Sequence, residues 1–258
     1  MELDLTRYEL GLSRTFSDTW DAFVRIPYFV KDQTAGVLFP GEGTPEERDA
    51  AIRAGYAHHR TEVYEGYSDF ETGAGWRKRG VFGEGSILRL LLGVALPVGE
   101  TESNPLTAGD LGLEHLHIQF GNGTFDPMID FYAGIPLAKK WAFSLYGKGR
   151  FPIYENNKGY LGSIEGTLIP RLTYLANKKL SLSTGLAANY YGYSEWDGTR
   201  DPNSGQLTLN GILSVGYKFS EHFTANASVM LPLYTDSFSD EDALDPEPVF
   251  SVSAAWTF

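Results

Sequence analysis

Charged side chains recur at every second position inside otherwise apolar segments of this 258-residue sequence. Between residues 129 and 133, for example, Ile129, Phe131 and Ala133 alternate with Asp130 and Tyr132. Because successive side chains of a β-strand point to opposite faces, this spacing gathers the charges on one face of a sheet. The charged residues that we predict to line a shared interior are Arg7, Glu9, Arg25, Asp69, Glu71, Arg77, Arg79, Arg89, Asp126, Asp130, Lys148, Arg150, Glu165, Arg171 and Lys218.

With Lys31 and Asp21 added, the interior set holds ten cations and seven anions, so we expect a mildly basic interior. One interpretation is a polar path whose basic side chains select anionic or polar solutes. The other is a set of cross-strand ion pairs that fills a narrow interior and gives each buried charge a partner. The two interpretations are compatible, and the residue types alone do not separate them.

Four of the five histidines fall in two long connections between the apolar segments, as His58, His59, His115 and His117. Histidine and carboxylate side chains together suit Zn²⁺ or Cu²⁺, so these residues are candidate metal ligands. Their spacing matches no zinc motif, and histidines are common in exposed loops. We therefore predict no metal site and no cofactor.

Residues for covalent catalysis are scarce in this chain. The absence of cysteine excludes thiol nucleophiles, disulfides and Cys-ligated metals. At the alternate strand positions that carry apolar residues, no histidine lies beside a serine. A serine nucleophile with a positioned base is therefore not indicated. A hydrolase built at the outer rim from Asp110, Glu114, His115 and His117 is a less favoured alternative. We predict that the protein is not an enzyme.

The elements that must position these residues are β-strands, because the alternation has a period of two. The sequence predicts eleven strands, at 4–13, 19–32, 68–82, 87–99, 123–138, 141–154, 161–175, 179–194, 206–219, 223–236 and 248–258. Short turns alternate with longer connections, which is the layout of an outer-membrane barrel with short periplasmic turns and long outer loops. The outer loops include 33–67, with a short helix at 45–54 between Thr44 and Gly55, and also 100–122 and 237–247.

Period-two alternation also fits a soluble β-sandwich or lipocalin-like barrel, in which the apolar face points inward. Three features favour the membrane version. The polar parity mixes glycine, serine and asparagine with charges of both signs, and the predicted strands are longer than those of most globular proteins. Aromatic residues also collect at segment ends, as in an interfacial girdle. We predict a single domain over residues 1–258.

The net charge of −12 argues against nucleic-acid binding, which requires a basic face. Part of the negative charge lies in loop 237–247, whose carboxylates could bind Ca²⁺ or engage lipopolysaccharide through divalent cations, or could simply be solvated. The chain begins Met-Glu-Leu-Asp, without a basic segment followed by an apolar one, so we expect any export signal to have been removed.

Three short blocks resemble bacterial outer-membrane proteins. The ending Trp256-Thr257-Phe258 is similar to their C-terminal signature, whose last aromatic is read by the barrel-assembly machinery. The blocks Leu-Gly-Val-Ala-Leu-Pro-Val-Gly at 92–99 and Gln-Phe-Gly-Asn-Gly-Thr-Phe-Asp-Pro at 119–127 resemble the MetA-pathway-of-phenol-degradation-like or "transporter" outer-membrane family. The likeness covers about residues 65–258 and implies a small barrel for passage of small, often hydrophobic compounds. It carries no catalytic residue across.

Bacterial single-chain barrels have even strand numbers, so we predict about twelve strands, with 115–120 as the best internal candidate for the additional one. The favoured function is a monomeric channel or passive transporter for small molecules in the bacterial outer membrane. The alternative is a non-enzymatic scaffold whose outer loops bind a partner or ligand. The expected partners are outer-membrane lipid, lipopolysaccharide, the assembly machinery through Phe258, and a small solute.

Overall fold

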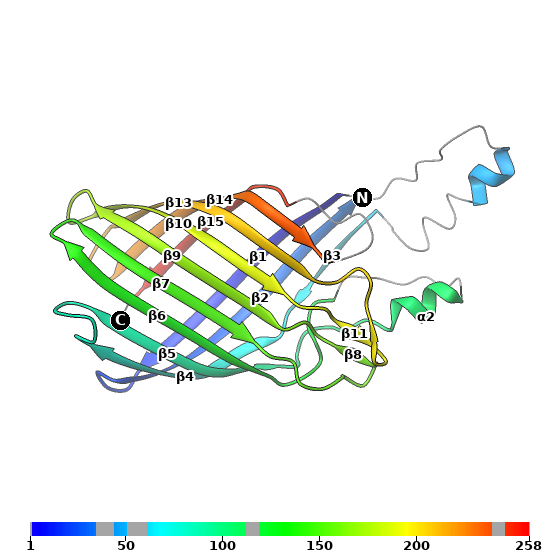
Figure 1. Ribbon diagram of the computed structural model, residues 1–258, viewed down its shortest axis with the longest axis horizontal. Helices are drawn as coiled ribbons and strands as arrows, with labels where there is room; N and C mark the ends of the chain where they lie inside the picture. The colour runs from blue at the N-terminus through cyan, green and yellow to red at the C-terminus, as the bar shows by residue number, and fades with distance from the viewer. Residues whose placement is uncertain (1, 35–43, 51–60, 112–118, 239–245, 258) are drawn as a thin grey trace.

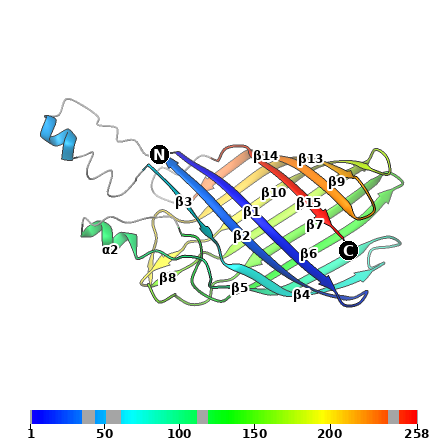
Figure 2. The same ribbon diagram turned by 180° about the vertical axis from the view of Figure 1, so that it is seen from behind.

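A single antiparallel β-sheet that curls into a barrel dominates the computed structural model (Figures 1 and 2). The structure describes residues 2–34, 44–50, 61–111, 119–238 and 246–257. The strands of the sheet are β1 (Glu2–Thr15), β2 (Trp20–Thr34), β3 (Glu62–Tyr67), β4 (Phe70–Arg79), β5 (Ile87–Leu96), β6 (Asp126–Ala138), β7 (Trp141–Arg150), β9 (Glu165–Leu175), β10 (Leu180–Tyr191), β13 (Gln206–Lys218), β14 (Phe223–Ser237) and β15 (Val249–Trp256).

The order of the strands is β1-β2-β4-β5-β6-β7-β9-β10-β13-β14-β15, and β3 pairs with β2 outside this path to complete twelve. Short turns join neighbouring strands at one end of the barrel, and longer connections join them at the other (Figure 1). We call these the turn end and the loop end. The predicted all-β, antiparallel, up-and-down fold is confirmed, and each predicted strand overlaps an observed one.

Strand β3 is an element that the sequence did not indicate, because it lies inside the predicted loop 33–67. It continues the line of β4, and both strands pair with β2. Ser68 and Asp69 separate them, and the Ser68 amide donates a hydrogen bond to the Pro27 carbonyl over 3.1 Å. This interruption turns the Asp69 side chain into a buried position at the loop end.

Apolar side chains face outward and polar side chains face inward. Leu92, Leu213 and Val252 are 66%, 53% and 85% exposed, whereas Asp69, Asp126 and Asp130 are at most 2% exposed. A soluble sandwich or lipocalin-like barrel requires the opposite arrangement, because exposed apolar surface in water is unfavourable. Among the described residues, no helix is long and apolar enough to cross a membrane.

The two edges of the sheet are β1 and β15, and no backbone pairing joins them among the described residues. Both strands run from the loop end to the turn end, and they lie on the same side of the barrel (Figure 2). Every residue of β15 is exposed on both faces. The predicted additional strand at 115–120 lies mainly outside the described residues, and Gln119 and Phe120 are not in a strand.

The loop end carries further secondary structure that was predicted only as loops. A helix, α2 (Pro105–Asp110), follows β5, and a second sheet consists of β8 (Tyr160–Leu161), β11 (Glu195–Trp196) and β12 (Thr199–Arg200). Residues 45–50 are helical and begin with a reciprocal capping box, in which the Glu47 amide donates to Thr44 Oγ1 and the Thr44 amide donates to Glu47 Oε2. Residues 51–54 of the predicted helix lie outside the described residues.

Candidate functional site

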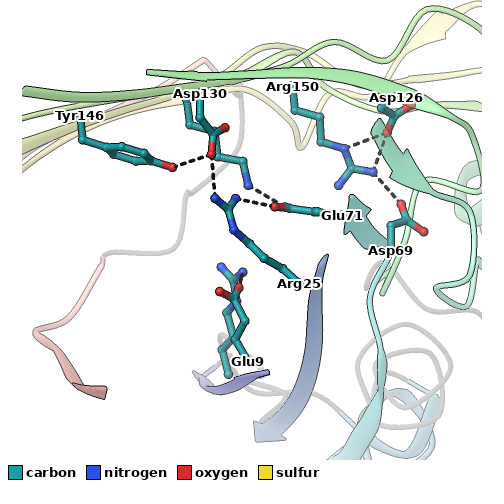
Figure 3. Close-up of polar contacts among 10 residues, drawn as sticks. Glu9, Arg25, Asp69, Glu71, Asp126, Asp130, Tyr146 and Arg150 are labelled. Atoms are coloured by element: carbon teal, nitrogen blue, oxygen red, sulfur yellow. Dashed lines mark hydrogen bonds and ion pairs between the residues drawn. The ribbon is translucent and has the colours of Figure 1, made fainter. Parts of the chain in front are cut away.

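The barrel interior holds a network of ion pairs and hydrogen bonds, which we call the central cluster: Arg25, Glu71, Asp130 and Tyr146, labelled in Figure 3, together with Lys148. Arg25 bonds Glu71 Oε2 over 2.9 Å and Asp130 Oδ2 over 2.8 Å. Lys148 Nζ lies 2.6 Å from the other Glu71 oxygen, and the Tyr146 hydroxyl donates to Asp130 over 3.4 Å. Each carboxylate therefore has a cationic partner.

The central cluster depends on contacts across the barrel interior rather than between adjacent strands only. Arg25 on β2 is paired in register with Glu71 on β4, but Asp130 lies on β6, with β4 and β5 between. Lys148 on β7 likewise reaches Glu71 on β4. These side chains therefore cross the interior and reduce its free cross-section at this level.

A second network, the loop-end cluster, surrounds Arg150 at the last residue of β7. Arg150 Nη2 lies 2.6 Å from Asp69 Oδ2 and 2.5 Å from Asp126 Oδ2, and all three residues are buried (Figure 3). Asp69 also accepts hydrogen bonds from the backbone amides of Gly99 and Asn122 over 3.1 and 2.8 Å. Asp69 thus joins both ends of the β5–β6 connection to Arg150 on the barrel wall.

A third pair lies nearer the turn end, where Arg89 on β5 bonds Asp21 on β2. Arg89 Nη2 lies 2.5 Å from Asp21 Oδ1, and its Nε lies 3.2 Å from Oδ2, which makes the contact bidentate. The pair passes over Gly75 of the intervening strand β4. A methyl group at position 75 would collide with Asp21 and would lie 2.8 Å from Leu91. Glycine at this position therefore makes room for the pair.

The three clusters compensate most of their own charge. The central cluster balances Arg25 and Lys148 against Glu71 and Asp130, and the pair of Arg89 with Asp21 is also neutral. The loop-end cluster keeps one negative charge in excess, since one arginine faces two aspartates. The described interior is therefore close to neutral at these levels, and the mildly basic character expected for the interior as a whole stays a prediction.

Eight of the fifteen predicted interior residues meet in these clusters: Arg25, Asp69, Glu71, Arg89, Asp126, Asp130, Lys148 and Arg150. Glu165 is paired in register with Arg150 and lies close to the loop-end cluster. The remaining predicted residues lie elsewhere. Arg7 and Glu9 form an exposed pair on the edge strand β1, while Arg77 bonds Thr15 Oγ1 over 3.2 Å at the turn end. Arg79 ends β4, and Lys218 bonds Glu221 in a turn over 2.7 Å.

The opposite wall of the interior carries hydroxyl and amide groups instead of ion pairs. Thr167 donates to Asn189 over 3.1 Å, and the Asn189 amide donates to Thr208 over 3.2 Å. Asn210 also donates to Thr208, over 3.3 Å. We call this side the hydroxyl-amide wall; its inward-facing members are Thr167, Thr173, Ser183, Asn189, Thr208, Asn210, Ser214, Asn226, Ser228, Ser251 and Ser253.

Arg171 is a charged residue among these hydroxyl and amide groups. It is paired in register with Ser144 and Gly185, and no hydrogen bond or ion pair to it occurs among the described residues. Ser214 Oγ is buried on the same wall without a hydrogen-bond partner in the described part of the chain. The wall thus offers donors and acceptors that are not fully used by the protein itself.

A hollow of about 230 Å³ lies on the β1 side of the interior, between Arg25 and Arg89. Phe23 lines it, and the Arg25 guanidinium lies 4.8 Å from the centre of the Phe23 ring. Glycine at positions 73 and 93 lets the strands β4 and β5 approach closely here, because a Cβ atom on either residue would collide with backbone atoms of the other strand. The hollow offers space beside the charged groups that a small solute could enter.

The loop end is covered by an ordered set of contacts that the sequence did not predict. Trp196 of β11 is 3% exposed and packs on Tyr160 of β8, with ring centres 4.8 Å apart. The Asn104 amide before α2 donates to Asp197 over 2.8 Å, and Arg200 lies 3.3 Å from the centre of the Tyr193 ring. Burial raises the pKa of the Tyr160 hydroxyl to about 12. The Asp-Gly dipeptide at 197–198 is the local sequence signal for the β11–β12 hairpin, because this dipeptide favours a tight turn in which both central residues have positive φ. Both residues have positive φ in the structure.

The candidate metal ligands His58, His59, His115 and His117 all lie outside the described residues. Within the ranges that are described, no group of three or more histidine or acidic side chains is placed to hold a metal ion. The metal prediction therefore stays untested.

The geometry was compared with known proteins. Neither the protein-family models nor the curated proteins gave a match to the sequence. Among solved structures, the COG4313 outer membrane channel from Pseudomonas putida F1 is similar, with a TM-score of 0.62 and 14% sequence identity. The match covers 96% of this chain and 80% of that channel. The two chains share a barrel fold. At this identity the likeness concerns the fold, and it does not distinguish the MetA-like family from other barrel families.

Proposed function

We propose that the protein is a narrow, passive outer-membrane channel for small polar solutes. The observation that carries the proposal is the inverted barrel, which is apolar outside and holds paired charges opposite a hydroxyl-amide wall inside. An apolar exterior matches the hydrocarbon of a bilayer, and a polar interior can replace the hydration of a passing solute. The similar fold of a bacterial outer membrane channel supports the same role.

The charge distribution favours weak rather than strong ion selectivity. Four interior cations, Arg25, Arg89, Lys148 and Arg150, are held by carboxylates within 3 Å, so their fields largely cancel at the distance of a passing ion. The hydroxyl-amide wall offers hydrogen bonds without net charge. Small polar solutes without a large net charge therefore fit this interior better than the anionic solutes that a basic interior would select.

The predicted surroundings belong to the same proposal. The protein lies in the outer membrane as a monomer, with its loop end outward toward lipopolysaccharide and its turn end toward the periplasm. Its assembly would use the C-terminal aromatic Phe258, a residue outside the described part of the chain. The resemblance to the MetA-like family remains a prediction, and so does the hydrophobic character of its solutes.

The test is single-channel recording in planar lipid bilayers, after the protein has been folded in detergent and its heat-modifiable gel mobility has been checked. We expect discrete conductance steps with a small preference between cations and anions. The double variant Arg25→Ala/Glu71→Ala should raise the conductance, since it truncates two side chains that cross the interior. The matched variant Lys218→Ala/Glu221→Ala, whose ion pair lies at a turn away from the central cluster, should not. A folded barrel that never conducts would overturn the proposal.

A second candidate function is a scaffold that binds a partner or ligand through its loop end. The observation that favours it is the ordered cover made by β8, β11, β12 and α2 above an interior crossed by ion pairs. A silent but folded barrel in the bilayer experiment would favour the scaffold over the channel.

A further inference from the structure

The turn end of the barrel is basic, although the chain as a whole has a net charge of −12. Each of the five turns between neighbouring strands carries or adjoins at least one lysine or arginine. Seven of these cations are exposed and form what we call the basic rim: Arg14, Lys78, Arg79, Lys139, Lys140, Lys178 and Lys179. The acids of the same turns are Asp18, Glu84 and Glu221, and Glu221 is already paired with Lys218. Positive charge therefore surrounds this end.

Exposed aromatic side chains occupy the same level. Trp20, Trp141 and Trp256 are 53%, 43% and 60% exposed on the outer face near the turns. Lys140 lies against the ring of Tyr174, with its Nζ 3.5 Å from the Tyr174 hydroxyl, and Tyr174 packs on Trp141 at 4.9 Å between ring centres. Tryptophan and tyrosine rings mark the level at which hydrocarbon meets lipid headgroups. The basic rim thus lies where headgroup phosphates would be.

The opposite end has the opposite charge. The described loop-end residues include the acids Glu46, Glu62, Glu100, Glu155 and Asp201, whereas few lysines or arginines accompany them. The basic rim is therefore a local feature of the turns and not a reflection of overall composition. Its cations are spread over four of the five turns rather than gathered in one patch, which matches a ring of lipids better than a single protein partner.

We infer that the basic rim binds the headgroups of anionic phospholipids. The inference rests on the proposed placement of the barrel in a membrane, but not on its activity as a channel. Lysine and arginine side chains near a membrane surface each favour anionic lipid by about fivefold in local concentration. The apolar stems of the lysines can follow the aromatic rings while the ammonium groups reach the phosphates. The ligand class is a phospholipid with a net negative charge, such as phosphatidylglycerol.

The tryptophans provide a direct probe of this inference. Four of the five tryptophans, Trp20, Trp76, Trp141 and Trp256, belong to strands at positions near the turn end, and Trp196 belongs to the loop end. The full-length protein would be folded into phosphatidylcholine vesicles with a fixed fraction of brominated phosphatidylglycerol. Quenching of tryptophan fluorescence beyond that expected for the bulk fraction measures enrichment of phosphatidylglycerol at the turn end. The variant Trp196→Phe removes the loop-end signal.

The key variant is Lys178→Gln/Lys179→Gln, because no described contact depends on either side chain and the turn lies beside Trp141 and Tyr174. We expect wild-type enrichment of several-fold, a clear reduction in this variant, and a loss of enrichment in about 1 M salt, where the screening length falls to about 3 Å. The matched control, Arg48→Gln/Lys158→Gln, removes the same charge from the loop end and should leave the enrichment unchanged.

Three results would overturn the inference. The first is wild-type quenching equal to the bulk fraction of brominated lipid, and the second is enrichment that persists in high salt. The third is an equal reduction in the loop-end control, which would assign the effect to net charge. The channel proposal has a separate readout, since conductance in pure phosphatidylcholine does not require the basic rim to bind lipid.

Discussion

At the residue scale, the structure separates buried charges that hold the loop end together from exposed charges that do not. Arg150 is the only described cation bonded to both Asp69 and Asp126, whose side chains are fully buried. The substitution Arg150→Ala would leave both carboxylates without a cation, so we expect a loss of about 3–5 kcal/mol in the free energy of unfolding. Urea unfolding in detergent, followed by tryptophan fluorescence, measures this loss.

The matched control is Arg7→Ala, which removes the same side chain from a pair that is 47% and 35% exposed. Solvent screens such a pair, so the expected loss is about 1 kcal/mol or less. Equal losses in the free energy of unfolding for the two variants would show that the burial of the loop-end cluster does not determine how much it stabilises the fold.

Charge compensation gives a second prediction at this scale. The double variant Asp21→Asn/Arg89→Gln removes a neutral pair, so the reversal potential under a KCl gradient should stay close to that of the wild type. The single variant Arg171→Gln removes a charge without a described partner, and it should shift the potential toward cation preference. A unit charge at 4 Å in water is worth about 1 kcal/mol, or about fivefold in local ion concentration. The reverse pattern would contradict the compensation described for the interior.

At the element scale, the sequence predicted the strands but not their partners across the barrel. Strand positions follow from local alternation, and the observed β6 and β13 begin or end within three residues of the predicted segments. The contact of Arg25 with Asp130 joins residues 105 positions apart and depends on the curvature of the whole sheet. No local pattern carries that information. Short elements such as β3 and β8 were missed because a few residues show no clear period.

Glycine positions within the strands allow a direct test at the element scale. Gly75→Ala would place a methyl group against Asp21 and Leu91, so we expect a loss of about 1–3 kcal/mol in the free energy of unfolding. Gly11→Ala is the matched control, because nothing lies within 4 Å of a Cβ atom at position 11. That control should change stability by less than about 0.5 kcal/mol. Urea unfolding of both variants under one set of conditions provides the comparison. Equal losses in the free energy of unfolding would show that the Asp21–Arg89 pair does not require glycine at position 75.

At the scale of the whole molecule, strand direction constrains how the barrel can close. Eleven strands in antiparallel order leave β1 and β15 running the same way, so a direct contact between these edges would have to be a parallel pair. A second copy of the chain, related by rotation about the membrane normal, would present edges that run in the same direction too. Antiparallel closure therefore needs one strand that runs from the turn end to the loop end.

This geometry predicts an uneven protection of backbone amides. In β6, β7 and β9, each strand is paired on both sides, so its amides are held in hydrogen bonds and should exchange slowly with solvent deuterium. In β1 and β15, the amides that face the unpaired edge have no described backbone acceptor and should exchange faster. Hydrogen–deuterium exchange with mass spectrometry on the barrel in lipid nanodiscs measures both sets together. Equal protection of the edge strands and the central strands would show that β1 and β15 are closed in the membrane, either against each other or by another strand, and that the edges of the described sheet are joined there.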